Sequence, residues 1–288
     1  MTNTVKIGFI GLGNMGIPMA CQLLKAGYPV LVYNRNKIKE ESVVAAGADK
    51  TSSMADVMKR SDVIITMVTD DAAVIEIFTG EQGLLTTAVT GRYIINMSTV
   101  SPEISRKMAT LCELAGNHYV DAPVSGSVKQ AQEGQLVIMV GADEAIFDDI
   151  KPVLEVLGKF VLRVGQTGAG NTVKLAINTL LAIQAQGLAE TINFANQQGI
   201  KTEDLLSLIN NSAIGTIFGK IKGEAIVQDN FKAAFALKNI VKDLRLAKDL
   251  GLDSPLANTA YSSFQQAESA YGNEDIIAIV KALKKDQS

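Results

Sequence analysis

Short apolar runs alternate with amphipathic stretches over the first half of the chain. The runs are typical of buried strands, and the stretches between them carry apolar residues at helical spacing. We predict strands at 5–10, 30–33, 62–68, 93–97, 118–121, 136–140 and 160–164. We predict helices between them at 15–26, 37–46, 102–115 and 144–157. Because strands that alternate with helices form βαβ units, the pattern indicates an α/β fold with a doubly wound, mostly parallel sheet.

The strand pattern ends near residue 164, and the rest of the chain has the pattern of helices only. A long helical pattern runs from Asn171 to about Gln198 with a broad apolar face, which is typical of a helix buried between two bodies. Further helices are predicted at 203–211, 237–250, 256–271 and 275–284. We therefore predict an α/β domain over 1–164 and an all-helical domain over 165–288 that opens with the long helix.

Composition and charge exclude several kinds of protein. The net charge is −3, whereas dedicated nucleic-acid binders are usually basic, so we expect no nucleic-acid partner. No apolar stretch approaches the ~20 residues that cross a bilayer. The first strand-like run begins too early to leave room for a signal peptide, so we expect a cytoplasmic protein without a membrane partner. Cys21, Cys112 and His118 lack the spacing of metal ligands, and we expect no metal site.

A glycine-rich sequence follows the first predicted strand. Gly11-Leu12-Gly13-Asn14-Met15-Gly16 stands where that strand turns into a helix, which is the context in which GxGxxG binds a dinucleotide in a Rossmann-type domain. Gly11 permits the tight turn, Gly13 lets a pyrophosphate approach the backbone, and Gly16 lets helix and strand pack closely. The helix N-terminus then offers N–H groups to the phosphates. A glycine-rich turn without a ligand is the alternative, and the context favours the dinucleotide.

The end of the second predicted strand indicates which dinucleotide would bind. An NAD enzyme usually has an acidic residue there, which binds the ribose 2′-hydroxyl. This chain has Asn34 at that position and Arg35 after it, with Lys37 and Lys39 close by. A guanidinium suits a 2′-phosphate, so we expect NADP(H), with NAD as the alternative cofactor. A solvated basic loop without a cofactor role is the other interpretation.

Three further motifs place polar residues where chemistry is expected. Asp121-Ala122-Pro123-Val124-Ser125-Gly126 follows a predicted strand, at the carboxyl edge of the sheet where such folds bind ligands. Gly168-Ala169-Gly170-Asn171-Thr172-Val173-Lys174 opens the long helix, and Asn178 lies one turn after Lys174 on the same helix face. Lys242-Asp243 lies in a later predicted helix. Taken alone, Lys174 is better explained as a surface lysine whose stem packs on apolar neighbours.

Together with the glycine-rich sequence, these motifs resemble the β-hydroxyacid dehydrogenase family. The family includes 3-hydroxyisobutyrate dehydrogenases, tartronate semialdehyde reductases and glyoxylate/succinic semialdehyde reductases. By this resemblance Lys174 is the catalytic lysine and Asn178 orients the substrate. Ser125 and Gly126 match the substrate-carboxylate site, and two further positions match substrate-proximal residues, Phe235 and Asp243. The remaining matches are to cofactor contacts: Val68, Thr69, Thr99 and Lys242.

The resemblance implies an NAD(P)-dependent oxidoreductase that acts on a small anionic carbonyl compound. Its substrate would be a carboxylated aldehyde, such as glyoxylate or succinic semialdehyde, that is interconverted with its hydroxy acid. Two departures from the common family pattern, Gly126-Ser127 and Ile177-Asn178, look more like the glyoxylate/succinic semialdehyde branch. The apolar surface of the helical half also predicts a homodimer or homotetramer.

Several alternatives remain open at this point. The chain could be a 3-hydroxyisobutyrate dehydrogenase or a tartronate semialdehyde reductase within the same family. An imine reductase or a relative of 6-phosphogluconate dehydrogenase would use the same scaffold, but imine reductases often lack the lysine. A non-catalytic NADPH-binding module belongs to a different class, and it does not require Ser125, Lys174 and Asn178 together.

Overall fold

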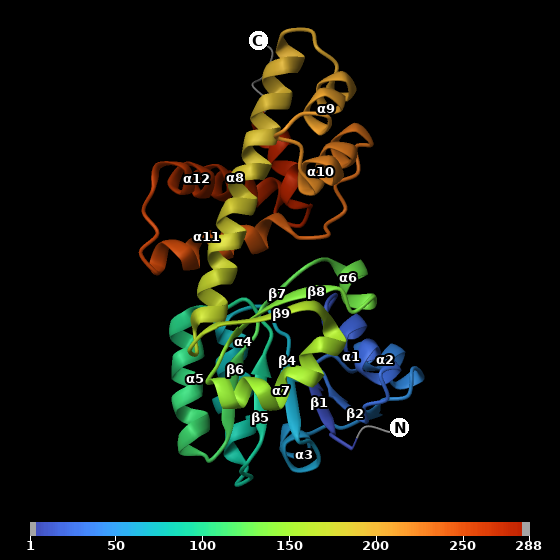
Figure 1. The fold of residues 1–288 in the computed structure, drawn as a ribbon, viewed down its shortest axis with the longest axis vertical. Coiled ribbons are helices and arrows are strands. Elements are labelled where there is room, and N and C mark those ends of the chain that lie inside the picture. Colours follow the sequence, from blue (N-terminus) through green and yellow to red (C-terminus); the bar gives the residue numbers. More distant parts are fainter. Residues whose placement is uncertain (1–3, 284–288) are drawn as a thin grey trace. The chain divides into compact units, whose positions relative to one another are not determined.

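The computed structural model describes residues 4–283. The chain divides into two compact units, Met1–Lys174 and Leu175–Ser288, which we call unit 1 and unit 2. Unit 1 is an α/β body and unit 2 is helical, which confirms the predicted fold class (Figure 1). The division falls inside α8 (Ala169–Gln197), whereas the boundary predicted from the sequence lies ahead of this helix.

Unit 1 is organised around one sheet. Within the described residues it contains nine strands in the order β3-β2-β1-β4-β5-β6-β8-β7, and β9 pairs with β8. All pairs from β3 to β6 are parallel, β8 is antiparallel to β6 and β7, and β9 is parallel to β8. The strands are β1 (Ile7–Ile10), β2 (Val30–Tyr33), β3 (Asp49–Lys50), β4 (Val63–Thr66), β5 (Tyr93–Asn96), β6 (His118–Asp121), β7 (Val124–Ser125), β8 (Leu136–Gly141) and β9 (Gly158–Gly165).

Helices of unit 1 connect these strands. They are α1 (Gly16–Lys25), η1 (Lys37–Glu40), α2 (Glu41–Ala45), α3 (Met54–Arg60), α4 (Asp71–Thr79), η2 (Leu84–Thr86), α5 (Pro102–Leu114), α6 (Val128–Gln132) and α7 (Glu144–Leu157). Ser101 accepts a hydrogen bond from Ile104 N (3.1 Å) and so begins α5, with Pro102 in its first turn. Asp70 accepts one from Ala73 N (2.9 Å) and begins α4 in the same way.

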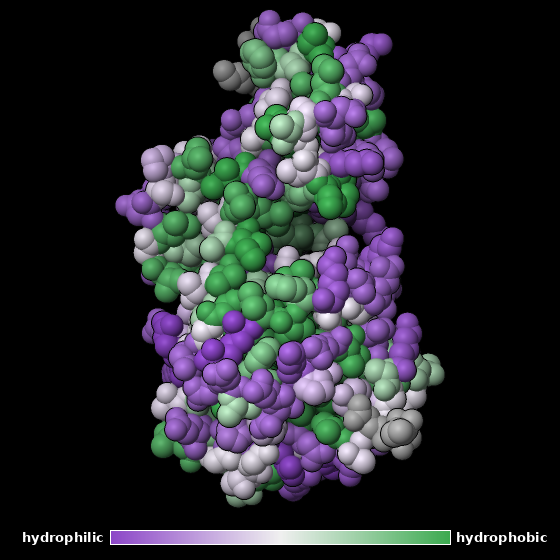
Figure 2. Space-filling model, in the orientation of Figure 1, coloured by the Kyte–Doolittle hydropathy of each residue, from purple (hydrophilic) through white to green (hydrophobic). Residues whose placement is uncertain are grey.

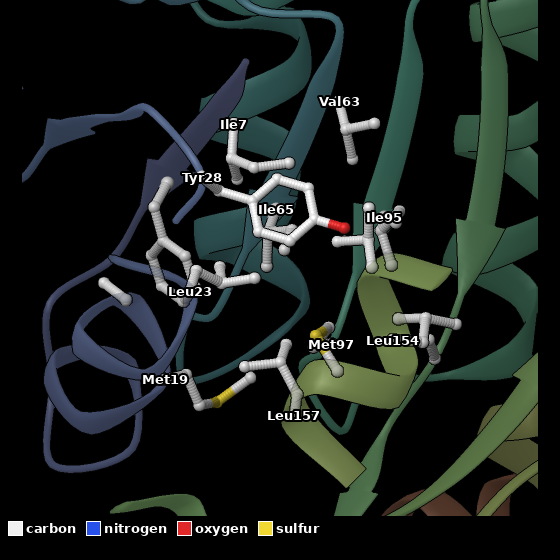
Figure 3. Close-up of a cluster of buried hydrophobic side chains, with 14 of the residues drawn as sticks. Ile7, Met19, Leu23, Tyr28, Val63, Ile65, Ile95, Met97, Leu154 and Leu157 are labelled. Carbon is white, nitrogen blue, oxygen red and sulfur yellow. The ribbon is translucent and has the colours of Figure 1, made fainter. Parts of the chain in front are cut away.

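The alternation of side chains along the strands gives unit 1 two hydrophobic clusters. Ile64 and Ile65 are neighbours on β4, yet Ile65 belongs to one cluster and Ile64 to the other. Successive strand residues point to opposite faces, so β1, β2, β4, β5 and β6 contribute to both clusters. Figure 3 shows the first cluster, in which Ile65 lies among side chains of α1 and α7 that include Leu23 and Leu154. The second cluster takes residues from α3, α4 and α5.

Unit 2 consists of the remainder of α8 and the helices that follow it. These are α9 (Thr202–Asn210), α10 (Ile217–Val227), α11 (Leu237–Asp249), α12 (Pro255–Tyr271), η3 (Ile276–Ala278) and α13 (Ile279–Ala282). Three alanines of α8, Ala182, Ala185 and Ala189, are fully buried in the core. Phe264 of α12 and Leu237 of α11 belong to the same cluster. Small residues on the central helix let its neighbours pack closely around it.

Apolar side chains are also exposed on unit 2. Leu208, Ile214 and Ile217 have 72%, 74% and 82% of their surface accessible. Figure 2 shows hydrophobic residues interspersed with hydrophilic ones on the visible face. No helix within residues 4–283 is long and apolar enough to cross a membrane. No group of His, Cys, Asp and Glu side chains in that range is arranged to hold a metal ion.

Most predicted elements are found within two residues of their expected bounds, but two predictions are wrong. The helix expected over 37–46 is a 3-10 turn followed by a short helix, because Asn36 accepts a hydrogen bond from Ile38 N and starts η1. The helix expected over 275–284 begins as the 3-10 turn η3, because Asp275 accepts one from Ile277 N. The last residue of that prediction, 284, lies outside the described residues. The sequence pattern also missed β3, β7, α3, α4, η2, α6 and α10.

Candidate active site

The glycine-rich loop between β1 and α1 has the form that a dinucleotide requires. Gly11 has φ +98°, and a Cβ there would overlap the carbonyl oxygen of Met67. A Cβ on Gly16 would overlap the carbonyl oxygen of Gly11, so only glycine lets α1 start so close to β1. A Cβ on Gly13 would meet no atom within 4 Å. This open space lies beside the helix N-terminus, so the loop fits a pyrophosphate that approaches the backbone at Gly13.

Asn34 connects the glycine-rich loop to the end of β2. Its Oδ1 accepts a hydrogen bond from Leu12 N at 2.9 Å, and its Nδ2 donates to the carbonyl of Asn36 at 2.7 Å. Its backbone N–H donates to Glu40 Oε1 at 2.8 Å. The side chain expected to lie at the ribose therefore also holds the loop expected to bind the phosphates.

The basic residues after Asn34 differ in their surroundings. The Lys37 ammonium lies 2.9 Å from Glu40 Oε1, 3.2 Å from the carbonyl oxygen of Thr51 and 4.2 Å from the centre of the Tyr33 ring. Glu40 is buried, and sequence reasoning did not single it out. Arg35 is exposed next to Asn34. Because the Lys37 ammonium already contacts Glu40, Thr51 and Tyr33, the Arg35 guanidinium is the better candidate for a 2′-phosphate.

A chain of buried polar groups fixes the loops that follow β4 and β5. Ser98 Oγ accepts a hydrogen bond from Val68 N at 2.8 Å, and Ser98 N donates to Asn96 Oδ1 at 3.1 Å. Thr66 Oγ1 donates to the same Asn96 oxygen at 3.1 Å. Thr99 follows Ser98 and is half-buried. The structure thus links the Val68 loop to the Thr99 loop through Ser98, which the sequence offered only as a turn residue.

Ser125 and Gly126 lie where β7 ends. Ser125 is half-buried, and Gly126 has φ +141° and is exposed. Ser127 then begins α6 with a capping box. The Ser127 side chain accepts a hydrogen bond from the backbone N–H of Gln130, and the Gln130 side chain accepts one from the backbone N–H of Ser127. The serine that stands where many family members have a second glycine therefore has a local structural role.

A buried carboxylate lies where β6 ends. Asp121 accepts hydrogen bonds from Gly168 N at 2.7 Å and Asn171 N at 2.8 Å, at the start of α8. Burial raises the pKa of this carboxyl to about 6, although the hydrogen bonds from backbone N–H groups act to lower the pKa. The sequence motif contained Asp121 but indicated no role for it.

The first turn of α8 is also bonded to the loop after β5. Asn171 Oδ1 accepts a hydrogen bond from Val100 N at 3.0 Å, and its Nδ2 donates to Ser105 Oγ at 3.2 Å. Lys174 lies three residues further along α8, at the end of unit 1, and is 8% exposed. It is therefore a buried lysine, and the interpretation as a surface lysine is wrong.

Unit 2 brings three of the predicted residues together. Asn178 Nδ2 donates to Asp243 Oδ2 at 2.6 Å, and the Lys242 ammonium lies 3.2 Å from Asp243 Oδ1. Asn178 and Asp243 are buried. Phe235 is half-buried, and its backbone N–H donates to Asp275 Oδ2 at 3.3 Å. Asp275 was not found from the sequence, because Lys222, Ala234 and Phe235, which it binds besides its neighbour Ile277, lie 40 to 53 residues away along the chain.

Two family models together match nearly the whole chain. Residues 6–168 match the model described as the NAD binding domain of 6-phosphogluconate dehydrogenase. Residues 168–283 match the model described as NAD-binding of NADP-dependent 3-hydroxyisobutyrate dehydrogenase. The two matches meet at the residue that precedes α8.

Named proteins of similar length are related to the chain over almost all of it. The 2-(hydroxymethyl)glutarate dehydrogenase of Eubacterium barkeri is 39% identical, over 99% of this chain and 97% of that protein. Glyoxylate/succinic semialdehyde reductase 1 of Arabidopsis thaliana is 34% identical, over 97% of this chain and 99% of that protein.

Among solved structures, the 3-hydroxyisobutyrate dehydrogenase of Mycobacterium tuberculosis, solved with L-serine, has a TM-score of 0.89. It is 29% identical and covers 99% of this chain and all of that chain. The matches extend over both units and include the motifs that hold the glycine-rich loop and Lys174. The chain thus belongs to the 3-hydroxyisobutyrate dehydrogenase-like, β-hydroxyacid dehydrogenase family of NAD(P)-dependent oxidoreductases that act on CH–OH groups.

Proposed function

We propose that this enzyme is an NADPH-preferring reductase that interconverts a small carboxylated aldehyde with its hydroxy acid. The observation that carries the proposal is the buried Lys174 in a helix whose start is fixed at the carboxyl edge of the sheet. The carboxyl edge of the sheet is where folds of this kind bind their ligands, so a lysine fixed there is placed to act on a bound substrate.

Lys174 transfers the proton in this scheme. When bound, the nicotinamide dinucleotide supplies or accepts the hydride. In the direction of reduction, the Lys174 ammonium stabilises the charge that develops on the carbonyl oxygen and donates a proton to it. In the direction of oxidation, the neutral amine removes the proton from the hydroxyl group. Both directions use the same atom, Lys174 Nζ.

The substrate is held by groups from two motifs. Ser125 and the backbone at Gly126 bind the substrate carboxylate, and Asn178 orients the oxygen that gains the proton. One hydrogen of Asn178 Nδ2 is donated to Asp243, which fixes the plane of the amide and directs the second hydrogen. Phe235 and Asp243 complete the substrate side, while Thr69, Thr99 and Lys242 contact the cofactor.

The preference for NADPH is assigned to Arg35. Its exposed guanidinium follows Asn34, where an acidic residue would select NAD. Lys37 contributes less, because its ammonium is paired with Glu40. NAD is the alternative cofactor, which Arg35→Ala should make competitive with NADP.

Within the family, the substrate is assigned to the semialdehyde branch. Motif details resemble glyoxylate/succinic semialdehyde reductases, and the relative at 39% identity is named for a hydroxymethyl dicarboxylate. Oxidation of the hydroxymethyl group would give an aldehyde, so both relatives are named for compounds that pair a carboxylate with an aldehyde or with the alcohol that yields one. The alternatives are the substrates of 3-hydroxyisobutyrate dehydrogenase and of tartronate semialdehyde reductase.

Steady-state oxidation of NADPH tests the proposal. The panel is glyoxylate, succinic semialdehyde, tartronate semialdehyde, methylmalonate semialdehyde and the aldehyde formed by oxidation of 2-(hydroxymethyl)glutarate, each repeated with NADH. We expect turnover of at least one compound, faster with NADPH than with NADH. Tight binding of NADPH with no turnover of any of them would contradict the proposal and favour a non-catalytic module or an imine reductase.

We also propose that the enzyme is a homodimer or homotetramer. The exposed apolar side chains around α9 and α10, such as Leu208 and Ile217, support this, because large apolar surface on one protein usually marks an interface. Light scattering of the purified enzyme measures the mass in solution. A monomer at micromolar concentration would contradict this assignment.

A further inference from the structure

We propose that Asp121 is a positioning residue of the reaction, which sets the place of Lys174 by capping the first turn of α8. The inference rests on the proposed role of Lys174 as the proton donor. It assigns a function to a buried carboxylate that does not itself touch the reacting atoms.

The start of α8 lacks an ordinary cap. The first N–H groups of a helix have no partner within the helix, and the side chain of the preceding residue usually accepts one of them. Here the preceding residue is Gly168, which has no side chain. Asp121, 47 residues earlier in the chain, accepts hydrogen bonds from Gly168 N at 2.7 Å and from Asn171 N at 2.8 Å. The backbone N–H of Gly170 is a third donor to this carboxylate.

Two glycines enclose the same carboxylate. A Cβ on Gly141, in β8, would overlap Asp121 Oδ1, and a Cβ on Gly170 would lie 2.9 Å from Asp121 Oδ2. The backbone thus approaches the carboxylate closely from two sides, and the side chain is inaccessible to solvent. Asp121 is held in one orientation, so the helix start that it caps is also held in one place.

The capped turn carries Lys174. The backbone N–H of Asn171 donates to Asp121, and its side chain accepts from Val100 N and donates to Ser105 Oγ. Asn171 thus joins the turn to the loop that contains Thr99. Lys174 is three residues further on, and residues at this spacing are neighbours on the helix surface. A rotation of the first turn would therefore move Lys174 relative to the loop proposed to contact the nicotinamide.

The protonation state of Asp121 controls this cap. A protonated carboxyl carries an O–H donor and loses part of its capacity to accept N–H groups. Burial raises its pKa to about 6. Of the ionisable groups on the elements around it, the Tyr119 phenol of β6 interacts with Asp121, the Arg106 guanidinium of α5 lies beside Gly168, and the Arg163 guanidinium of β9 donates to the carbonyl of Ala142 next to Gly141. Lys174 is on α8 itself. We therefore expect hydride transfer to slow as the pH falls through about 6.

The test compares the wild-type enzyme with Asp121→Asn in single-turnover oxidation of bound NADPH from pH 5 to 8. The substrate is succinic semialdehyde, or whichever aldehyde of the panel above is turned over fastest. We expect Asp121→Asn to slow hydride transfer by about 10²-fold at neutral pH, the loss typical of a small misplacement of a reacting group. Binding of NADPH should change less than about twofold, and the fall in rate near pH 6 should disappear.

Asp149→Asn is the matched control, since it makes the same chemical change to a carboxylate that accepts a hydrogen bond from Tyr93 on the exposed side of α7. It should retain the rate and the pH profile of the wild type. If Asp121→Asn does not fold, the wild-type profile decides: a rate that stays constant down to pH 5 while NADPH remains bound overturns the inference.

Lys174→Met separates this inference from the proposed function. Full activity of Lys174→Met would remove the proposed function. An inactive Lys174→Met together with a wild-type rate and pH profile for Asp121→Asn would overturn only the positioning role of Asp121.

Discussion

Each unit of the molecule contains a buried aspartate that holds distant parts of the chain together, but the two are stabilised differently. In unit 1, the partners of Asp121 are backbone N–H groups of the turn that begins α8. In unit 2, Asp275 accepts hydrogen bonds from the Lys222 ammonium at 2.6 Å and from the backbone N–H groups of Ala234 and Phe235. One carboxylate is thus solvated by amides and the other is paired with a buried cation.

The difference indicates what each carboxylate contributes. The charge of Asp275 is compensated by Lys222, and together they fix the segment that carries Phe235, so this pair contributes to the integrity of unit 2. The raised pKa of Asp121 means that its ionised form makes the folded state less stable than the protonated form would. A group that reduces stability at neutral pH and holds the helix of Lys174 is best explained by function.

Removal of the Lys222 ammonium, the buried partner of Asp275, should have the largest effect on stability. Lys222→Met leaves the Asp275 carboxylate buried without its partner, which typically destabilises a protein by about 3–5 kcal/mol. Urea unfolding of the full chain, followed by circular dichroism, measures the loss. A loss below about 1 kcal/mol would show that Asp275 does not depend on the pair.

The second-largest effect is expected from Asp121, which should make the free energy of unfolding depend on pH. Its pKa is about 6 in the folded protein and 3.8 when unperturbed, so between these values the folded state binds a proton that the unfolded state does not. Stability contributed by this group is therefore complete below pH 3.8 and is lost as the pH rises through 6. Relative to Asp121→Asn, the wild type should lose about 2 kcal/mol between pH 4 and pH 7. A constant difference between the two unfolding free energies over this range would contradict the assignment.

A smaller effect is expected from Gly13 in unit 1, where a substitution should weaken NADPH binding and leave stability nearly unchanged. Gly13→Ala places a methyl group in open space, so the unfolding free energy should change by no more than about 1 kcal/mol. The same methyl group would obstruct the pyrophosphate, and we expect NADPH to bind about tenfold more weakly, equivalent to about 1.4 kcal/mol. Fluorescence titration measures the affinity. Gly16→Ala is the contrasting variant, because its methyl group would overlap the Gly11 carbonyl and should destabilise the fold.

The smallest effect is expected from a second ion pair of unit 2. Lys281 and Glu274 lie 2.7 Å apart, but their side chains are 28% and 35% exposed, compared with 11% and 3% for Lys222 and Asp275. Partial exposure screens the pair, so Lys281→Met should reduce the unfolding free energy by less than about 1 kcal/mol. Urea unfolding beside Lys222→Met tests this. Equal losses for the two variants would show that burial is not what distinguishes the pairs.

Local sequence patterns predicted much of the fold and part of the site. The strands at 30–33 and 118–121 and the helix at 144–157 have the predicted bounds, because their apolar periodicity is strong and turn residues flank them. The two-residue strands β3 and β7 carry too few positions to show a period. The glycine-rich loop was recognisable because three glycines at fixed spacing follow a predicted strand: Gly11 and Gly16 have no room for a Cβ, and Gly13 leaves open space for a pyrophosphate.

Long-range polar contacts could not be predicted in the same way. Asn178 and Asp243 are 65 positions apart, and Lys222 and Asp275 are 53 apart, so only the packed helices of unit 2 bring them together. For Asp121 a signal was present: Gly141 and Gly170 leave room for a carboxylate, but which carboxylate occupies it depends on the tertiary fold. Sequence periodicity determines elements, whereas these contacts depend on how the elements pack.

The central claim, that Lys174 transfers the proton in an NADPH-dependent reduction, is tested most directly by single-turnover kinetics of Lys174→Met. The enzyme is loaded with NADPH, its binding is confirmed by fluorescence, and the oxidation of NADPH is followed after mixing with the best aldehyde of the panel. The account predicts unchanged NADPH binding and hydride transfer that is slower by about 10²–10⁴-fold. Hydride transfer within a few-fold of the wild-type rate would contradict it.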